Sequence, residues 1–241
     1  MSQKNEGEAN NEIKVIFLGS VGVGKTSLIA RYKTHKFIEN ITSTFGPNFM
    51  TINKIIKNKK YVLNLWDTAG QEKYHSLTQT FTKNAKVIVL VYSITDKKSF
   101  SDLDSWLKSV KDENGEQGYT LGIAANKSDL YDQSQVDDEE GKNYSKKINA
   151  IWKSTSALEE DQGIEELMNE LLNNYVTILE KDLNINDVTI KLDSSIMNDK
   201  KKGNCCKGNV NEKKIKGRHK SHSANQSSIN KYVNANENKD K

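Results

Sequence analysis

The sequence has 241 residues, of which 35% are hydrophobic and 28% charged, and its formal net charge is +4. This length suits one folded domain with extensions, or two small domains. The only cysteines, Cys205 and Cys206, are adjacent, which excludes a disulfide framework and favours a reducing compartment. No stretch reaches the roughly 18 apolar residues of a membrane-spanning helix, and no apolar segment at the N-terminus indicates a secretory signal. We therefore expect a cytoplasmic protein.

The first third of the chain predicts strands that alternate with a loop and a helix. Residues 1–11 are polar and are expected to be disordered. Residues 13–18 form an apolar run, predicted as a buried strand, which leads through a glycine-rich loop into a helix over residues 26–33. Two further strand-like runs, 49–57 and 61–66, are separated by a short polar connection, and this arrangement predicts an antiparallel hairpin.

The middle of the chain continues this alternation. The continuous apolar run at residues 87–92 is typical of a strand buried on both faces. Apolar residues at helical spacing follow over residues 100–110, then a strand over 121–125 and a weaker one over 150–152. A last helix has apolar residues along one face over residues 164–178. Alternating strands and helices indicate a layered α/β domain with a mostly parallel sheet.

The sequence changes character after about residue 182. Residues 199–241 contain twelve basic and four acidic side chains, a net charge of +8, whereas residues 1–198 carry −4. The tail is rich in Asn, Lys, Ser and Gly and cannot bury enough apolar surface to offset the entropy of ordering it. We therefore predict a disordered N-terminus (1–11), a folded domain (12–181) and a disordered basic tail (182–241).

The glycine-rich loop has the pattern of a phosphate-binding loop. It reads Gly19-Ser20-Val21-Gly22-Val23-Gly24-Lys25-Thr26 and stands between a predicted strand and a predicted helix. Glycines let successive backbone N–H groups surround phosphate oxygens, and a helix N-terminus adds partial positive charge. Lys25 is placed to reach the β- and γ-phosphates, and the Thr26 hydroxyl to bind Mg²⁺. The alternative, a mere turn, is disfavoured by the strand–loop–helix context.

A second motif predicts recognition of guanine. Asn126-Lys127-Ser128-Asp129 follows a predicted strand, at the edge where ligands bind in open α/β sheets. A carboxylate there can accept hydrogen bonds from both N1–H and the exocyclic amine of guanine, which adenine cannot match. Ser156-Ala157 follows the next strand. Surface loops often produce either pattern alone, so their weight comes from their order and spacing after the phosphate loop.

A third motif, Trp66-Asp67-Thr68-Ala69-Gly70-Gln71-Glu72, follows the hairpin. Asp67 is expected to hold Mg²⁺ through a water, although a cap at the strand end is an alternative role. The backbone N–H of Gly70 would approach the γ-phosphate, and Gln71 would orient the attacking water.

The motifs GSVGVGKT, WDTAGQE, NKSD and TSA, in this order and spacing, resemble those of the Ras superfamily of small GTPases over nearly all of residues 12–181. The resemblance implies the α/β fold of P-loop NTPases, with a six-stranded, mostly parallel sheet, one antiparallel edge strand and helices on both faces. It also implies hydrolysis of GTP to GDP and phosphate with Mg²⁺ as cofactor.

The resemblance also implies roles for individual residues. Gln71 and Lys25 would be catalytic, Thr44 would join Thr26 on Mg²⁺ in the GTP state, and Phe37 would lie against the guanine. The implied nucleotide-binding residues are Gly19, Ser20, Val21, Gly22, Val23, Gly24, Lys25, Thr26, Ser27, Phe37, Thr44, Asp67, Gly70, Asn126, Lys127, Asp129, Ser156 and Ala157.

Within the superfamily the sequence is most similar to the Rab family, in the stretches 44–49, 65–74 and 85–95. The similarity implies a GTP-dependent switch in vesicle traffic, whose partners are an exchange factor, a GTPase-activating protein and effectors. The implied effector and switch residues are Phe45, Gly46, Phe49, Trp66 and Phe81. The last three match the Rab aromatic triad, and a plain core role is the alternative. A divergent member of another Ras-like branch, acting as a nucleotide-gated scaffold with little turnover, is the alternative function.

Three positions depart from the family pattern. Val21 stands where Rabs often have serine, and its branched side chain would point toward the space of Gln71 and the attacking water, so we expect slow hydrolysis. The alternative is that neighbouring residues compensate for this side chain. Leu158 replaces the lysine that usually follows the Ser-Ala pair, and Pro47 lies in the effector stretch, where it removes a backbone donor.

Cys205 and Cys206 lie where a Rab chain would end, among basic residues. Palmitoylation of the pair, helped by lysines near anionic lipid, would hold the protein peripherally on the cytosolic face of endomembranes. A soluble polar tail is the alternative. The tail has neither interleaved aromatic residues nor a recognisable nucleic-acid module, so we expect no nucleic-acid partner.

Overall fold

The computed structural model describes residues 11–39, 48–68, 81–159 and 163–199, with side chains up to Asp182. The chain divides into two units, residues 1–192 and 193–241. All the described strands belong to the first unit, and the described part of the second is the end of the last helix. None of the described helices has the length and apolar character needed to cross a membrane.

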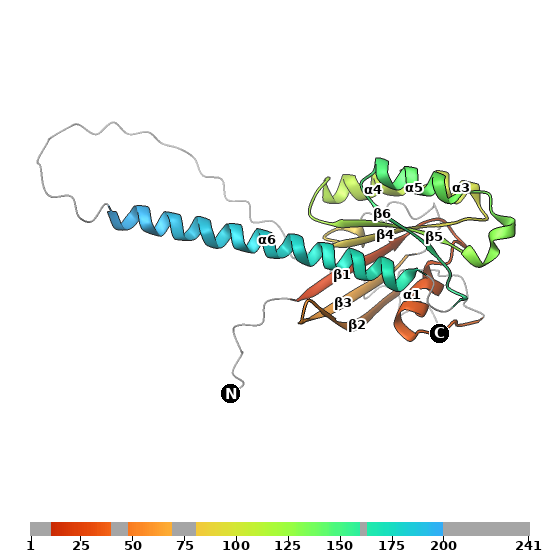
Figure 1. The fold of residues 1–241 in the computed structure, drawn as a ribbon, viewed down its shortest axis with the longest axis horizontal. Helices are drawn as coiled ribbons and strands as arrows, with labels where there is room; N and C mark the ends of the chain where they lie inside the picture. Colours follow the sequence, from red (N-terminus) through yellow and green to blue (C-terminus); the bar gives the residue numbers. More distant parts are fainter. Residues whose placement is uncertain (1–10, 40–47, 69–80, 160–162, 200–241) are drawn as a thin grey trace, which may run out of the picture. The chain divides into compact units, whose positions relative to one another are not determined.

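The first unit is built on one sheet of six described strands in the order β2-β3-β1-β4-β5-β6 (Figure 1). The strands are β1 Glu12–Leu18, β2 Asn48–Ile56, β3 Lys59–Asp67, β4 Val87–Ser93, β5 Thr120–Asn126 and β6 Ile151–Thr155. Every neighbouring pair is parallel except β2 and β3, which form the predicted antiparallel hairpin at one edge. The predicted α/β fold with one antiparallel edge strand is therefore confirmed.

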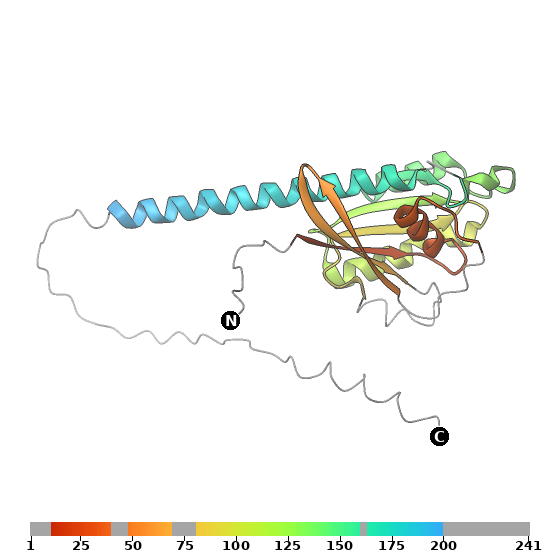
Figure 2. The same ribbon diagram turned by 90° about the horizontal axis from the view of Figure 1, so that it is seen from below.

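Helices cover both faces of the sheet (Figures 1 and 2), and the strands β4 and β5 are buried on both of their faces. The helices are α1 Lys25–Thr34, α3 Lys97–Ser101, α4 Leu103–Asn114, α5 Asp138–Lys147 and α6 Ile164–Asp199, with a 3₁₀ helix, η2, at Ser128–Gln133. Alternate residues of β1 and β4 enter two separate cores, one shared with α1 and α6 and the other with α4. All seven residues of β4 are buried, which explains its unbroken apolar sequence.

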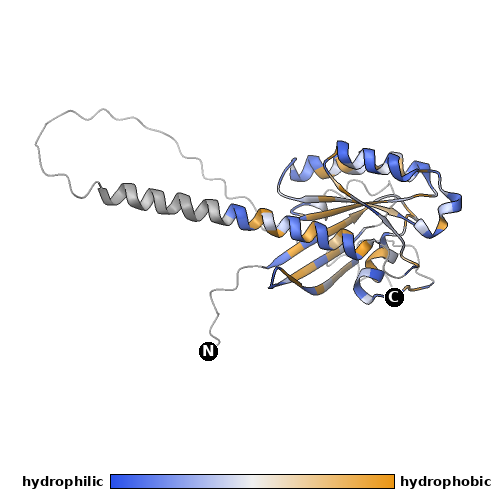
Figure 3. Cartoon of the chain, viewed as in Figure 1, coloured by the Kyte–Doolittle hydropathy of each residue, from blue (hydrophilic) through white to orange (hydrophobic). Residues whose placement is uncertain are grey.

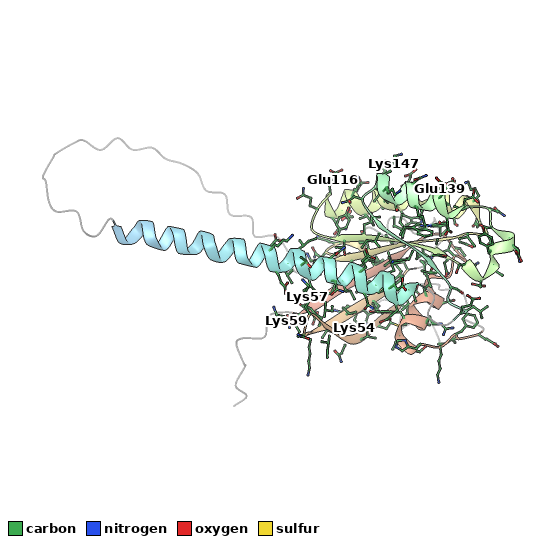
Figure 4. All side chains as sticks on the ribbon, in the orientation of Figure 1. Lys54, Lys57, Lys59, Glu116, Glu139 and Lys147 are labelled. Atoms are coloured by element: carbon green, nitrogen blue, oxygen red, sulfur yellow. The ribbon has the colours of Figure 1, made fainter. Side chains whose placement is uncertain are left out.

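The β2–β3 hairpin is fastened to α6 by charged side chains (Figure 4). Lys54 pairs with Glu165 near the start of α6. Farther along the helix, Lys57 Nζ lies 3.1 Å and Lys59 Nζ 3.7 Å from the Glu180 carboxylate. The hydrogen bond from Lys57 lowers the pKa of Glu180. Because these groups are partly exposed, the pairs orient the hairpin more than they stabilise it.

Two features of the helices differ from the sequence-based expectations. The apolar spacing over residues 100–110 predicted one helix, but α3 and α4 are separate and meet at Asp102. The folded domain was predicted to end near residue 181, whereas α6 continues to Asp199. The division of the chain at residues 12 and 181 otherwise stays a prediction.

Helix α5 was not predicted at all, because its sequence is mostly hydrophilic (Figure 3). Its buried residues are only Gly141 and Ser145. A Cβ atom at Gly141 would lie 2.5 Å from both the Tyr92 hydroxyl and Trp152 Nε1. The helix can therefore pack this closely because Gly141 has no side chain. A pattern of apolar residues in the sequence cannot reveal such a contact.

Replacing this glycine should destabilise the protein even though alanine favours helix. We expect Gly141→Ala to lower the free energy of unfolding by about 1–3 kcal/mol, because the buried Tyr92 and the partly buried Trp152 would have to move. Urea denaturation followed by circular dichroism measures this change. Asn143→Ala, at an exposed position of the same helix, should be neutral or slightly stabilising. Equal stability of the two variants would contradict the packing argument.

Candidate functional site

The phosphate-loop sequence connects the end of β1 to the start of α1 in a tight path. Gly19 has a φ of +150°, and a Cβ there would lie 2.1 Å from the Val91 carbonyl oxygen on β4. Gly24 has a φ of +96°, and its Cβ would lie 2.3 Å from Asn126 Nδ2. Both positions thus require glycine, because the loop lies directly against the carboxyl ends of β4 and β5.

The start of α1 presents positive charge to this loop. The Lys25 side chain is buried, and its Nζ donates to the Gly19 and Ser20 carbonyl oxygens at 2.7 and 2.9 Å. Burial lowers the pKa of Lys25 to about 8, an effect that the nearby Asp67 carboxylate opposes. No side chain of the described residues caps the helix at Gly24, and its first turn contains no acidic residue. A helix N-terminus of this kind, beside a poorly solvated ammonium group, is suited to bind an anion.

Two oxygen-bearing side chains that the sequence predicted to bind Mg²⁺ lie together beside Lys25. Thr26 Oγ1 donates to Asp67 Oδ2 at 2.6 Å. Asp67 ends β3 and is buried, and the next residue, Thr68, fixes this strand end by donating to the Phe17 carbonyl oxygen at 2.8 Å. A hydroxyl and a carboxylate in contact are the hard oxygen donors that Mg²⁺ prefers, so the pair fits this ion.

Asn126 joins the phosphate loop to the next two strands. It ends β5, is 1% exposed, and donates from Nδ2 to the Val23 carbonyl oxygen at 2.7 Å. Thr155 Oγ1, at the end of β6, lies 3.4 Å from Asn126 Oδ1. The amide is thus oriented by partners on both sides, and these contacts connect β5 with the phosphate loop and with β6.

Asp129 is positioned by Ser156, which follows the neighbouring strand β6. Ser156 Oγ donates to Asp129 Oδ1 at 2.6 Å and accepts from the backbone N–H groups of Leu158 and Glu159 at 3.1 and 3.2 Å. Lys127 has a φ of +66°, which turns the chain from β5 into η2. One Asp129 oxygen is therefore anchored while the side chain is only half-buried, an arrangement that leaves a carboxylate able to accept from a ligand.

Of the remaining residues predicted to bind nucleotide, Ser27 is half-buried and Ala157 is buried, and the others are exposed or lie outside the described part of the chain. Phe37, Val21 and Leu158 are 39%, 52% and 52% exposed, at the rim of the loops just described. The predicted residues that lie outside the described residues are Thr44, Phe45, Gly46, Gly70, Gln71, Cys205 and Cys206.

The three aromatic residues predicted as a triad do lie together. The ring centroids are 5.2 Å apart for Phe49 and Trp66 and 5.8 Å apart for Trp66 and Phe81. Lys14 Nζ lies 4.8 Å from the Trp66 ring centroid, and Phe49 is 51% exposed. The cluster is packed on one side and open on the other, so both the core and the surface interpretation apply.

Two residues whose side chains form hydrogen bonds to these loops were not predicted from the sequence. Asp102, between α3 and α4, accepts from Ser20 Oγ at 2.9 Å and so holds the phosphate loop. Arg31 of α1 donates to the backbone just after Ser156. The sequence around Asp102 gives no indication of this contact. Arg31, in contrast, lies among the apolar residues of α1, and a charged residue at such a position can be noticed in the sequence.

Comparison with known proteins agrees with this geometry. The family model described as Ras family matches residues 14–177. The chain is 41% identical to Ras-related protein Rab-11B of Dictyostelium discoideum, over 66% of this chain and 72% of that protein. It is 37% identical to human Ras-related protein Rab-31, over 82% of this chain and 99% of that protein. Human Ras-related protein Rab-22A is 37% identical over 62% of this chain and 76% of its own length.

The bond between Asn126 and Val23 should be important for stability. We expect Asn126→Asp to lower the free energy of unfolding by about 1–3 kcal/mol, because it replaces a buried donor with a carboxylate that faces a carbonyl oxygen. Urea denaturation measures the loss. Thr155→Val, which removes only the longer contact to the same side chain, should cost less. An Asn126→Asp protein as stable as the wild type would show that this bond does not hold the loops together.

Proposed function

The chain belongs to the Ras family of small GTPases, and from this premise we propose that it acts as a Rab-type switch in vesicle traffic. It is a GTPase, which hydrolyses GTP to GDP and phosphate. The proposal concerns its mode of action: GTP would order the residues around Thr44 and Gly70, and hydrolysis would release them. The observation that supports it is the Asn126–Val23 hydrogen bond, which joins the loop predicted to bind phosphate to the strand end that precedes the loop predicted to bind the base.

In this proposal each side of the nucleotide has its own binding groups. The loop from Gly19 to Gly24 and the start of α1 would bind the phosphates, and Lys25 would exchange its carbonyl partners for phosphate oxygens. Thr26 and Asp67 would hold Mg²⁺, which would neutralise charge on the β- and γ-phosphates. Asp129 would accept from N1–H and the exocyclic amine of guanine, held in place by Ser156.

Hydrolysis would depend on Gln71 orienting the attacking water, with Lys25 stabilising charge on the transferred phosphate. The exposure of Val21, at 52%, is compatible with the hypothesis of slow turnover, because the described residues do not bury this side chain of the phosphate loop. A branched group there would compete for space with Gln71 and the water.

The Rab names of the relatives support a role on membranes in which the protein recruits effectors. The exposed side of the aromatic cluster, together with Phe45 and Gly46, would recruit effectors in the GTP state. An exchange factor and a GTPase-activating protein would control that state. Lipidation of Cys205 and Cys206, with the lysines around them, would place the protein on the cytosolic face of endomembranes.

Guanine recognition can be tested by changing the nucleotide that the protein prefers. In Asp129→Asn the amide oxygen can accept from N1–H and the amide nitrogen can donate to the C2 carbonyl oxygen of xanthine, whereas with guanine the same nitrogen would face the exocyclic amine, a donor against a donor. We expect GDP affinity to fall by about 10²-fold or more and xanthosine diphosphate to become the better ligand, as measured by isothermal titration calorimetry. Asp132→Asn, an exposed position in the same 3₁₀ helix, is the matched control. A variant that keeps the GDP preference would contradict the proposed base site.

The effect of Val21 can be tested by single-turnover hydrolysis. Val21→Ser should hydrolyse bound GTP several-fold faster than the wild type, because the smaller side chain frees the space around the attacking water. Ile55→Ser, at an exposed apolar position of β2, should leave the rate unchanged. Equal rates in the wild type and Val21→Ser would rule out slow turnover from this cause.

A further inference from the structure

We propose that Arg31 is a positioning residue for guanine binding, which fixes the loop that holds Asp129 by fastening its backbone to α1. This inference rests on the proposed function, because it assigns a role within the same nucleotide site. Arg31 is in the last turn of α1, and it is separated from the loop it binds by more than half of the chain.

The guanidinium group is buried and bonds only to backbone carbonyl groups among the described residues. Arg31 is 7% exposed. Its Nε donates to the Ala157 oxygen at 2.8 Å and its Nη2 to the Leu158 oxygen at 2.5 Å, while Nη1 donates to the His35 oxygen at 2.9 Å. Each nitrogen of the group thus has a partner, and two of these partners are consecutive residues of the loop after β6.

The choice of arginine follows from this geometry. The planar, forked guanidinium can donate to two adjacent carbonyl groups and to a third on the other side, whereas the single nitrogen of lysine cannot reach all three. The positive charge lies in the last turn of α1, where the carbonyl groups at the end of a helix favour a cation. The charge is therefore stabilised by oriented backbone dipoles, and these bonds fix the helix end and the loop in one arrangement.

The same loop is bound to Asp129 from its other side. Ser156 Oγ accepts from the backbone N–H of Leu158 and donates to the Asp129 carboxylate. Leu158 is thus held through its oxygen by Arg31 and through its nitrogen by Ser156. Contacts run without a break from α1 through the loop to Asp129, so losing Arg31 would loosen the carboxylate that recognises the base.

The arrangement also explains how the site tolerates Leu158. The Leu158 side chain is half-exposed, and it takes the place of a lysine in the resembling family. The structure uses the backbone of this residue, fixed by Arg31 and Ser156, so the loop conformation does not depend on which side chain it carries.

The test measures how fast the full-length protein, with Mg²⁺ in excess, releases two fluorescently labelled nucleotides, GDP and inosine diphosphate. Inosine diphosphate lacks the exocyclic amine that Asp129 would recognise. We expect Arg31→Met to release GDP about 10-fold faster or more, and inosine diphosphate to be affected much less, so that the wild-type preference for GDP shrinks. Lys33→Met, an exposed position in the same helix, should match the wild type for both nucleotides.

The two release rates separate the possible outcomes. If Arg31→Met releases GDP at the wild-type rate, or if both nucleotides are released faster by the same factor, the positioning role is overturned. If circular dichroism shows that Arg31→Met does not fold, the same release rates are measured for Arg31→Lys, which keeps the positive charge but lacks the forked guanidinium group. A wild-type protein that binds neither nucleotide would contradict the proposed function itself. That result can be told apart from failure of the Arg31 role, which appears only as a difference between the wild type and the variants.

Discussion

The hydrogen bond from the Asn126 side chain to the Val23 carbonyl oxygen links the two halves of the site. It crosses from the end of β5 to the phosphate loop, and it requires glycine at position 24, where any side chain would occupy the position of the Asn126 amide. The contact holds the phosphate loop against the end of β5, from which the chain continues to Asp129. A buried amide with partners on both sides serves this purpose, because leaving it unpaired would be costly.

The sheet explains why such distant segments meet. β1, β3, β4, β5 and β6 are parallel, so their carboxyl ends lie along one edge, and the phosphate loop, Asp67, Asn126 and the loop after β6 all follow those ends. Side-chain bonds then connect neighbouring loops: Thr26 to Asp67, and Ser156 to Asp129. Each loop holds the next, which suits a site that must bind both ends of a nucleotide.

Much of the fold and the candidate site could be predicted from the sequence, because the relevant signals are local. Buried parallel strands appear as unbroken apolar runs, and the phosphate loop has a fixed spacing of glycines before Lys25. Helix α5 was not predicted because it packs through Gly141. The extension of α6 to Asp199 was not predicted because its apolar residues lose their regular helical spacing after about residue 182. The role of Arg31 depends on carbonyl groups far along the chain, which no local pattern reveals. Gln71 and Thr44 stay predictions.

The central claim is that these loops form one guanine-nucleotide site, and the nucleotide that copurifies with the protein tests it most directly. The full-length chain, purified in Mg²⁺ without added nucleotide, is denatured, and the released small molecules are separated by ion-exchange chromatography. We expect close to one GDP or GTP per protein molecule. The buried Lys25 and the hydrogen bond that holds the phosphate loop to Asn126 favour slow release of the nucleotide. Adenine nucleotide in that fraction, or protein that is folded and carries no nucleotide, would contradict it.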